Sequence, residues 1–241
     1  MTEAEFTGFR PAALTFLRRL RRNNEREWFE RNRGTYEGEL RAPMAALVED
    51  VDVRLATMAP ELVGDPRRSL FRIHRDVRFS KDKSPYKTHV ACWFFHGDAG
   101  RGVGTTTPHG GAGFYFHMEP DRISIGGGIW MPPRPTLQRI RDVVAEDHRP
   151  LARVLADPTL KRRFGTLAEE NMLSRMPRGF SDQHPAAQLL RHQSFTVGRE
   201  ITQRDAFSAR LPDLLARDYA RMLPLVRWIN GALGLRTLAR R

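Results

Sequence analysis

Residues 113–130, GFYFHMEPDRISIGGGIW, predict a β-hairpin. In the first half, apolar and polar side chains alternate, which is the period of a strand with two different faces. One face would carry Phe114, Phe116 and Met118, and the other Tyr115, His117 and Glu119. RISIGGGIW is a second apolar run, and the turn sequence Glu119-Pro120-Asp121 separates the two. The pattern therefore favours two adjacent antiparallel strands.

Three further stretches have strand character. SLFRIH at 69–74 alternates apolar with polar residues, THVACWFFHG at 88–97 is largely apolar, and SFTVGREI at 194–201 follows a helical stretch. We expect strands near 70–74, 88–96, 113–119 and 122–129 to share one mainly antiparallel sheet. The segment GDAGRGVGTTTPHGGAG at 97–113 is rich in glycine and threonine without periodicity, so a flexible loop is predicted there.

The first and last thirds of the chain have helical periodicity. PAALTFLRRLRRNN and EREWFERN predict two helices, with Asn24 as the N-cap of the second. A long helix should then run from Tyr36 to about Met58, with a kink or break at Pro43. TLQRIRDVVAED is helical as well, and two helices are expected near 203–217 and 218–233. The predicted fold is a single α+β domain spanning 1–241, with N- and C-terminal helices covering one face of the central sheet.

The composition is that of a globular protein with an excess of positive charge. Hydrophobic residues make up 40% and charged residues 28%, the formal net charge is +12, and no apolar run approaches the length of a membrane span. Because the N-terminus is acidic and mixed, a secretory signal is not expected either, and we expect a cytoplasmic protein that does not associate with membranes. Cys92 is the only cysteine, and the apolar run VACWFF around it predicts a buried, inert thiol.

Several stretches resemble the uncharacterised family catalogued as domain of unknown function 2461. They are FLRRLRRNNEREWFERNRGTY, FRIHRDVRFSKDKSPYKTHVACWF, GFYFHMEP, GGGIWMPPRPTLQRIR, MPRGFSDQHPAAQLL and LPLVRWIN, in the family's order across nearly all of the chain. The resemblance implies a soluble single-domain protein and brings no established reaction with it. The sequence also contains no GxSxG elbow, Walker loop, EF-hand or CxxC pair, so common catalytic motifs do not supply a reaction.

Charge is concentrated in residues 71–87, FRIHRDVRFSKDKSPYK, where three of the chain's four lysines stand. The candidate ligand-binding residues of this segment are Arg72, Arg75, Asp76, Arg78, Lys81, Asp82 and Lys87. Arginine forks and lysine point charges bind phosphate or carboxylate, and lysine also exchanges protons when buried, so Lys83 is a candidate catalytic residue. The alternative is a structural ion-pair network in which Asp76 and Asp82 neutralise their neighbours over a packed Tyr86.

The polar face of residues 113–119 is the second candidate region. His117 could act as a base oriented by Glu119, with Tyr115 beside them, so all three are candidate catalytic residues. An ordinary exposed sheet face is the alternative, and no metal-binding spacing occurs. If both regions share one side of the sheet, Lys83 or Lys87 should lie within roughly 10 Å of His117.

The end of the hairpin and later residues supply weaker candidates. The glycines of GGGIW at 126–130 permit close approach of backbones or leave room beside a ligand. Trp130 is a candidate wall of the ligand site, with a core position the stronger expectation. Arg134 and Arg199 could close the pocket, with ordinary surface positions the stronger expectation.

Two function classes follow from these residues. The first is a binding pocket for a small molecule that bears phosphate or carboxylate, with catalysis left open. The second is a nucleic-acid-binding protein without catalysis, which the positive net charge favours, although arginines on solvated helix faces account for the same charge. A structural or adaptor protein without a concave pocket is a third class. No pattern predicts a cofactor or an oligomeric state.

Overall fold

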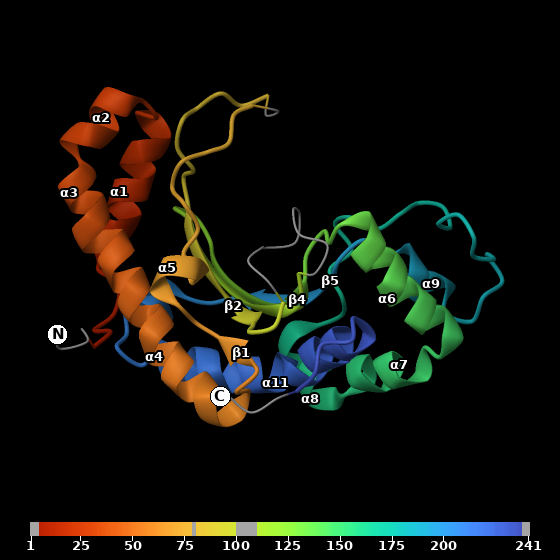
Figure 1. Ribbon diagram of the computed structural model, residues 1–241. Helices are drawn as coiled ribbons and strands as arrows, with labels where there is room; N and C mark the ends of the chain where they lie inside the picture. The colour runs from red at the N-terminus through yellow and green to blue at the C-terminus, as the bar shows by residue number, and fades with distance from the viewer. Residues whose placement is uncertain (1–4, 79–80, 100–109, 238–241) are drawn as a thin grey trace.

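The computed structural model describes residues 5–78, 81–99 and 110–237. The predicted hairpin is present (Figure 1): β3 (Gly113–Met118) pairs antiparallel with β4 (Ile123–Ile129), and Met118 lies opposite Ile123. The backbone N–H of Glu119 donates to the carbonyl oxygen of Arg122 at 2.9 Å and closes the turn. Most of the predicted flexible loop at 97–113 lies outside the described residues.

Within the described residues, five strands form one sheet in the order β1-β2-β3-β4-β5. The remaining strands are β1 (Leu62–Val63), β2 (Val90–His96) and β5 (Phe195–Glu200). Every neighbouring pair is antiparallel. The predicted α+β class is therefore confirmed, together with the strands expected near 88–96, 113–119, 122–129 and 194–201.

The prediction of a strand near 70–74 is wrong. Leu70 and His74 make only isolated bridges, to Cys92 and Tyr86, and β1 takes the edge of the sheet. Leu70 and His74 are four positions apart in the sequence, whereas their bridge partners, Tyr86 and Cys92, are six positions apart. The segment between Tyr86 and Cys92 therefore contains two extra residues, which form a bulge. A bulge interrupts the ladder of hydrogen bonds and re-aims side chains. We call residues 70–78 and 81–89, which project from the sheet in Figure 1, the arm.

A helical hairpin stands beside the arm. Its elements are α1 (Pro11–Arg22), α2 (Arg26–Arg31), α3 (Arg33–Tyr36), the π-helical turn η1 (Glu37–Arg41) and α4 (Ala42–Met58). The interruption predicted at Pro43 takes the form of η1, in which the N–H of Ala42 bonds to the carbonyl oxygen of Glu37, five residues back. Asn24 does not cap α2, because its side-chain amide bonds instead to the backbone N–H and carbonyl oxygen of Tyr86 in the arm.

The remaining helices are α5 (Pro66–Ser69), α6 (Arg134–Glu146), α7 (Arg149–Ala156), α8 (Pro158–Phe164), α9 (Ala187–Arg191), α10 (Gln203–Ala206) and α11 (Leu211–Ala232). The two helices predicted near 203–217 and 218–233 are instead the single turn α10 and the long α11, because Thr202 and Asp205 form a capping box around one short turn. None of the described helices is both long and apolar enough to cross a membrane.

Helices α4 and α11 pack beneath the sheet, as Figure 1 shows. On this face the ring of Tyr219 in α11 stacks on Phe114 at 4.4 Å, and Phe9 stacks on Phe116 at 5.8 Å. Cys92 lies on the same face, fully buried, and burial raises the pKa of its thiol. The apolar side chains of β3 therefore belong to the core, and its polar side chains project from the opposite face.

Candidate functional site

The charged segment contains two ion pairs that use both of its acids. Arg75 pairs with Asp82 at 2.7 Å, and Arg78 pairs with Asp76 at 2.7 Å, which lowers the pKa of Asp76 to about 2. Part of the predicted ion-pair network is thus real. It leaves a surplus, because the structure gives no carboxylate partner among the described residues to Arg72, Lys81, Lys83 and Lys87.

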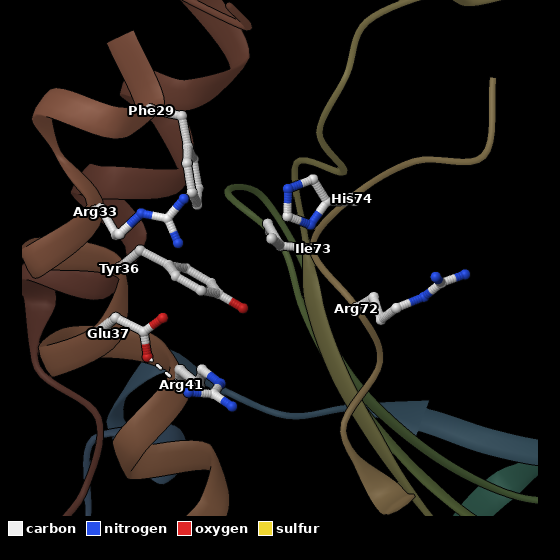
Figure 2. Close-up of a pocket in the computed structure, with 8 residues that line it drawn as sticks. All are labelled: Phe29, Arg33, Tyr36, Glu37, Arg41, Arg72, Ile73 and His74. Carbon is white, nitrogen blue, oxygen red and sulfur yellow. Dashed lines mark hydrogen bonds and ion pairs between the residues drawn. The ribbon is translucent and has the colours of Figure 1, made fainter. Parts of the chain in front are cut away.

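Lys87 is the most constrained of these cations. It is half-buried, and its ammonium nitrogen lies 5.6 Å from the centroid of the Phe71 ring. Burial lowers its pKa first, and the charges of Arg72 and Arg75 lower it further. The guanidinium of Arg72 points to the side of the arm away from α2 and α3, as Figure 2 shows. Three cations therefore converge at one place.

Arg75 reaches the same place with one donor unused. Its Nε is buried and has no hydrogen-bond partner among the described residues, although the rest of its guanidinium contacts Asp82 and the Tyr86 carbonyl oxygen. A buried donor without a partner costs free energy unless a ligand or water accepts from it. Arg75 therefore keeps one N–H available as a donor near Lys87.

The polar side chains of β3 form a continuous line. The Tyr115 Oη and the His117 Nδ1 are 3.0 Å apart, and the His117 Nε2 and the Glu119 Oε1 are 3.6 Å apart. The His117 side chain is 16% exposed and that of Glu119 is 38% exposed, so the line runs from the interior to solvent. The Tyr115 hydroxyl and the His117 Nδ1 are within hydrogen-bond distance, whereas the contact between the His117 Nε2 and Glu119 is longer than a hydrogen bond.

His89 completes this region and was not among the residues singled out in the sequence. Its ring lies 4.6 Å from that of His117. A signal did exist: Val90, Cys92 and Phe94 form the apolar face of their run, so His89 belongs to the opposite face. The position of His89 also depends on the bulge in the arm, and no local sequence pattern predicts that bulge.

Phe71 joins the two regions. One side of its ring faces Lys87, and the ring makes an edge contact with Tyr115 at 5.8 Å. The positive charges of Lys87 and Arg75 also contribute to lowering the pKa of His89, after burial and the neighbouring His117. We call the joined set the sheet-face site: Arg72, Arg75, Lys87, His89, Tyr115, His117 and Glu119.

Other candidates lie elsewhere. Lys83 is exposed and donates to the Val77 carbonyl oxygen at 2.8 Å, and Lys81 is exposed as well. Trp130 is not in the core, because it is 56% exposed, and it stands four residues beyond Gly126, the partner of Tyr115. At about 3.3 Å per residue, that separation is about 13 Å, so Trp130 does not border the Tyr115 ring.

The predictions for Arg134 and Arg199 are resolved as follows. Arg134 is exposed at the start of α6. Arg199 is not an ordinary surface arginine, and it does not close the site. It pairs with Asp218, a fully buried carboxylate of α11, at 2.6 Å on the core side of the sheet.

Residues 12–228 match the model of one protein family, described as "Conserved hypothetical protein (DUF2461)". The chain belongs to the DUF2461 family. Searches of curated proteins and of solved structures found no match. The family model confirms the resemblance of the sequence and, as its description says, names no reaction, so the function of this DUF2461 protein must be argued from its side chains.

On the β4 side of Tyr115, the two nearest cross-strand positions of this DUF2461 protein carry no side chains. Tyr115 lies opposite Gly126 on β4, and Gly126 lies opposite Gly198 on β5. A methyl group added to Gly126 would come within 4 Å of only one described atom, the Val197 carbonyl oxygen at 3.2 Å. Trp93 is the neighbour of Tyr115 on the other side. The glycines therefore leave a flat floor of backbone next to the Tyr115 ring.

Burial sets the protonation states of His117 and Tyr115 at neutral pH. Burial lowers the pKa of His117 to about 4, with a smaller effect from Arg122, and raises the pKa of the Tyr115 hydroxyl. At neutral pH the imidazole is therefore neutral and the phenol keeps its proton. In one tautomer the Tyr115 hydroxyl donates to the His117 Nδ1 while the Nε2–H faces Glu119. The described residues contain no cluster of three or more His, Cys, Asp or Glu able to hold a metal ion.

We expect acid to destabilise the DUF2461 fold through its two neighbouring histidines. Burial, then the neighbouring His117, lowers the pKa of His89 to about 4, as burial does for His117, against an ordinary 6.5. Between pH 6.5 and 4 the unfolded chain then binds more protons than the folded chain, so the free energy of unfolding falls as pH falls. After a discount for partial exposure, the loss for the pair should be about 2 kcal/mol between pH 7 and pH 5.

Urea unfolding at both pH values measures this loss. The double variant His89→Gln/His117→Gln is the control, since it keeps every carboxylate and loses only the two imidazoles. It should show a smaller fall in stability than the wild type over this interval. Equal pH dependence in the two proteins would contradict the expected protonation states.

Proposed function

We propose that this protein binds a small molecule carrying phosphate or carboxylate at the sheet-face site. The single observation that supports this best is Lys87, a half-buried ammonium whose pKa is lowered by burial and by the charges of Arg72 and Arg75. Burying like charges together is unfavourable, and a bound anion reverses that cost. One oxygen of the anion could also accept a hydrogen bond from the Arg75 Nε–H.

The body of the ligand would extend from the anion toward Tyr115. The side-chain-free floor of Gly126 and Gly198 offers space there, and the Tyr115 ring, which contacts Phe71, borders it. A ligand of this shape has one charged end and a flat or compact body. Such a combination of apolar walls and a few polar groups is usual for small-molecule sites.

General acid–base chemistry is the second part of the proposal. The Tyr115 hydroxyl would take a proton from the bound molecule as it passes its own proton to the His117 Nδ1, and Glu119 would stabilise the imidazolium that forms. The neutral state of His117 at pH 7 supports the accepting role of its Nδ1. A cytoplasmic location is part of the same proposal, and a single cysteine buried in the core fits a reducing compartment.

The test compares two lysine variants. Inorganic phosphate and a panel of phosphorylated and carboxylated metabolites are titrated calorimetrically into wild type, Lys87→Met and Lys161→Met. Lys161 is exposed in α8 and serves as the matched control. We expect Lys87→Met to weaken the best ligand by about tenfold or more, the loss of one charge-assisted hydrogen bond, and Lys161→Met to leave it unchanged.

Two results would overturn the proposal. One is the absence of binding for every anion in the panel. The other is equal weakening in both variants, which would mean that general charge rather than the site attracts anions. Random-sequence DNA duplex is titrated in parallel, and micromolar affinity that falls steeply with salt and ignores Lys87→Met would favour the nucleic-acid function instead.

A further inference from the structure

A cavity lies on the other side of the arm from the sheet-face site, between the arm and the helical hairpin. Its volume is about 180 Å³. Figure 2 shows Phe29, Arg33, Tyr36 and Arg41 on the helical wall and Ile73 and His74 on the arm. Arg72 lines it with its stem only, because the guanidinium points away. We call this cavity the hairpin groove; the sheet-face site does not include it.

Tyr36 directs an unused hydroxyl into the hairpin groove. Its residue is only 9% exposed, and its hydroxyl points from the helices toward residues 72–74 in Figure 2. No described group forms a hydrogen bond with this hydroxyl. Burial raises its pKa, so it remains a donor at all ordinary pH values. A hydroxyl at the wall of a cavity that donates to no described group is free to donate to a ligand.

The π-helical turn places Arg41 beside Tyr36. In a regular α-helix, residues five apart differ in direction by about 140° and would not share a wall. In η1 the hydrogen bond spans five residues, so Tyr36 and Arg41 come to lie one above the other and both line the groove. The departure from α-helical geometry therefore coincides with the position at which Tyr36 and Arg41 both line the groove. Such turns occur often at functional sites.

The size and walls of the groove fit one aromatic ring. A cavity of about 150 Å³ accommodates benzene, whereas drug-sized ligands need about 300 Å³ or more. Phe29, stacked on Tyr86 at 4.1 Å, forms a rigid aromatic wall, and the Ile73 side chain faces it from the arm. An apolar ring would therefore lie between two apolar side chains, with the rest of the groove open to solvent.

The charges lining the groove favour an acidic ring substituent. Arg33 and Arg41 both border it, and Glu37 is the only acid in the lining. Glu37 is already paired with Arg41 at 3.0 Å, and Arg33 is held by Glu30. Arg41 is 61% exposed and has further donors, so it can contact a carboxylate while keeping Glu37.

We propose that the hairpin groove binds a single-ring aromatic carboxylate. The ring lies between Phe29 and Ile73, and the carboxylate accepts hydrogen bonds from the Tyr36 hydroxyl and from the Arg41 guanidinium. This site is independent of the sheet-face site, because the arm separates them.

Benzoate is the probe, and its neutral analogue benzamide is the matched ligand. Backbone-amide NMR titration should show benzoate shifting residues around Tyr36 and Ile73, with a dissociation constant in the range of about 0.1–1 mM for so small a molecule. Tyr36→Phe removes only the hydroxyl and should weaken benzoate about five- to tenfold. Arg41→Gln should weaken it to a similar extent, and Arg31→Gln, an exposed arginine of α2, should not.

Each other outcome would overturn the assignment. Benzamide binding as tightly as benzoate would remove the carboxylate preference. Shifts confined to His89 and Tyr115 would place benzoate at the sheet-face site instead, and Lys87→Met, which should leave groove binding unchanged, would then abolish them. Equal affinity in wild type and Tyr36→Phe, or no shifts at millimolar benzoate, would show that the groove binds no aromatic acid.

Discussion

Gly128→Ala should lower the free energy of unfolding by about 4 kcal/mol or more, enough to prevent stable folding of a typical domain. Gly128 stands in β4 with a φ of +127°, a conformation open only to glycine. An added methyl group would lie 1.9 Å from the Phe195 carbonyl oxygen of β5. That oxygen belongs to the backbone of a paired strand, so it cannot move aside without breaking the β4–β5 ladder.

Thermal unfolding followed by circular dichroism, together with the soluble yield, measures this effect. Gly34→Ala is the matched control, because a methyl group there would meet no described atom within 4 Å and the residue is helical. It should stabilise the protein by about 0.5–1 kcal/mol. A Gly128→Ala protein that melts within a few degrees of wild type would contradict the close backbone approach.

Asp218→Ala should lower the free energy of unfolding by about 3 kcal/mol. Asp218 is 0% exposed and pairs with Arg163 at 2.9 Å, Arg199 at 2.6 Å and Arg221 at 3.5 Å. Alanine would leave three guanidinium groups converging on a position without negative charge. Breaking a buried ion pair from one side typically costs 3–5 kcal/mol, and the lower end applies because the arginine side chains reach solvent.

Urea unfolding of Asp218→Ala is compared with that of Asp213→Ala. Asp213 lies on the same helix and pairs with Arg54, but its side chain is 50% exposed, so its loss should cost less than about 1 kcal/mol. The triple variant Arg163→Gln/Arg199→Gln/Arg221→Gln should remove most of the difference when combined with Asp218→Ala. If Asp218→Ala and Asp213→Ala are equally stable, Asp218 does not join α8 and β5 to α11.

The sheet-face site could be predicted in part. Alternation in GFYFHMEP placed Tyr115 and His117 on the polar face of a strand, and the structure has them there, 3.0 Å apart. The excess of positive charge in residues 71–87 was also readable, since two acids cannot neutralise six cations. The sequence did not show which of those six cations lie at the site. Lys87 joins the site and Lys83 does not, because the arm turns its loop toward solvent.

The hairpin groove was beyond prediction from the sequence. In the sequence, Tyr36 is one apolar position of a helical repeat. A π-helical turn has no sequence periodicity of its own, so the pattern does not predict it. Its partners Ile73 and His74 are almost forty residues away in the chain. The exposure of Trp130 was not predictable either. This aromatic residue follows a buried strand, yet it is 56% exposed in the fold.

The sequence by itself determined most of the local elements: the strands β2 to β5, the helices where apolar residues recur every three or four positions, and the burial of Cys92 within an apolar run. These follow from the geometry of neighbouring residues, which the order of side chains encodes directly. The tertiary structure alone decided the bulge that presents His89, the Asn24 contact that replaces a helix cap, and the burial of Asp218 among arginines. Each depends on where a distant segment passes, and that path is set by the packing of the whole core.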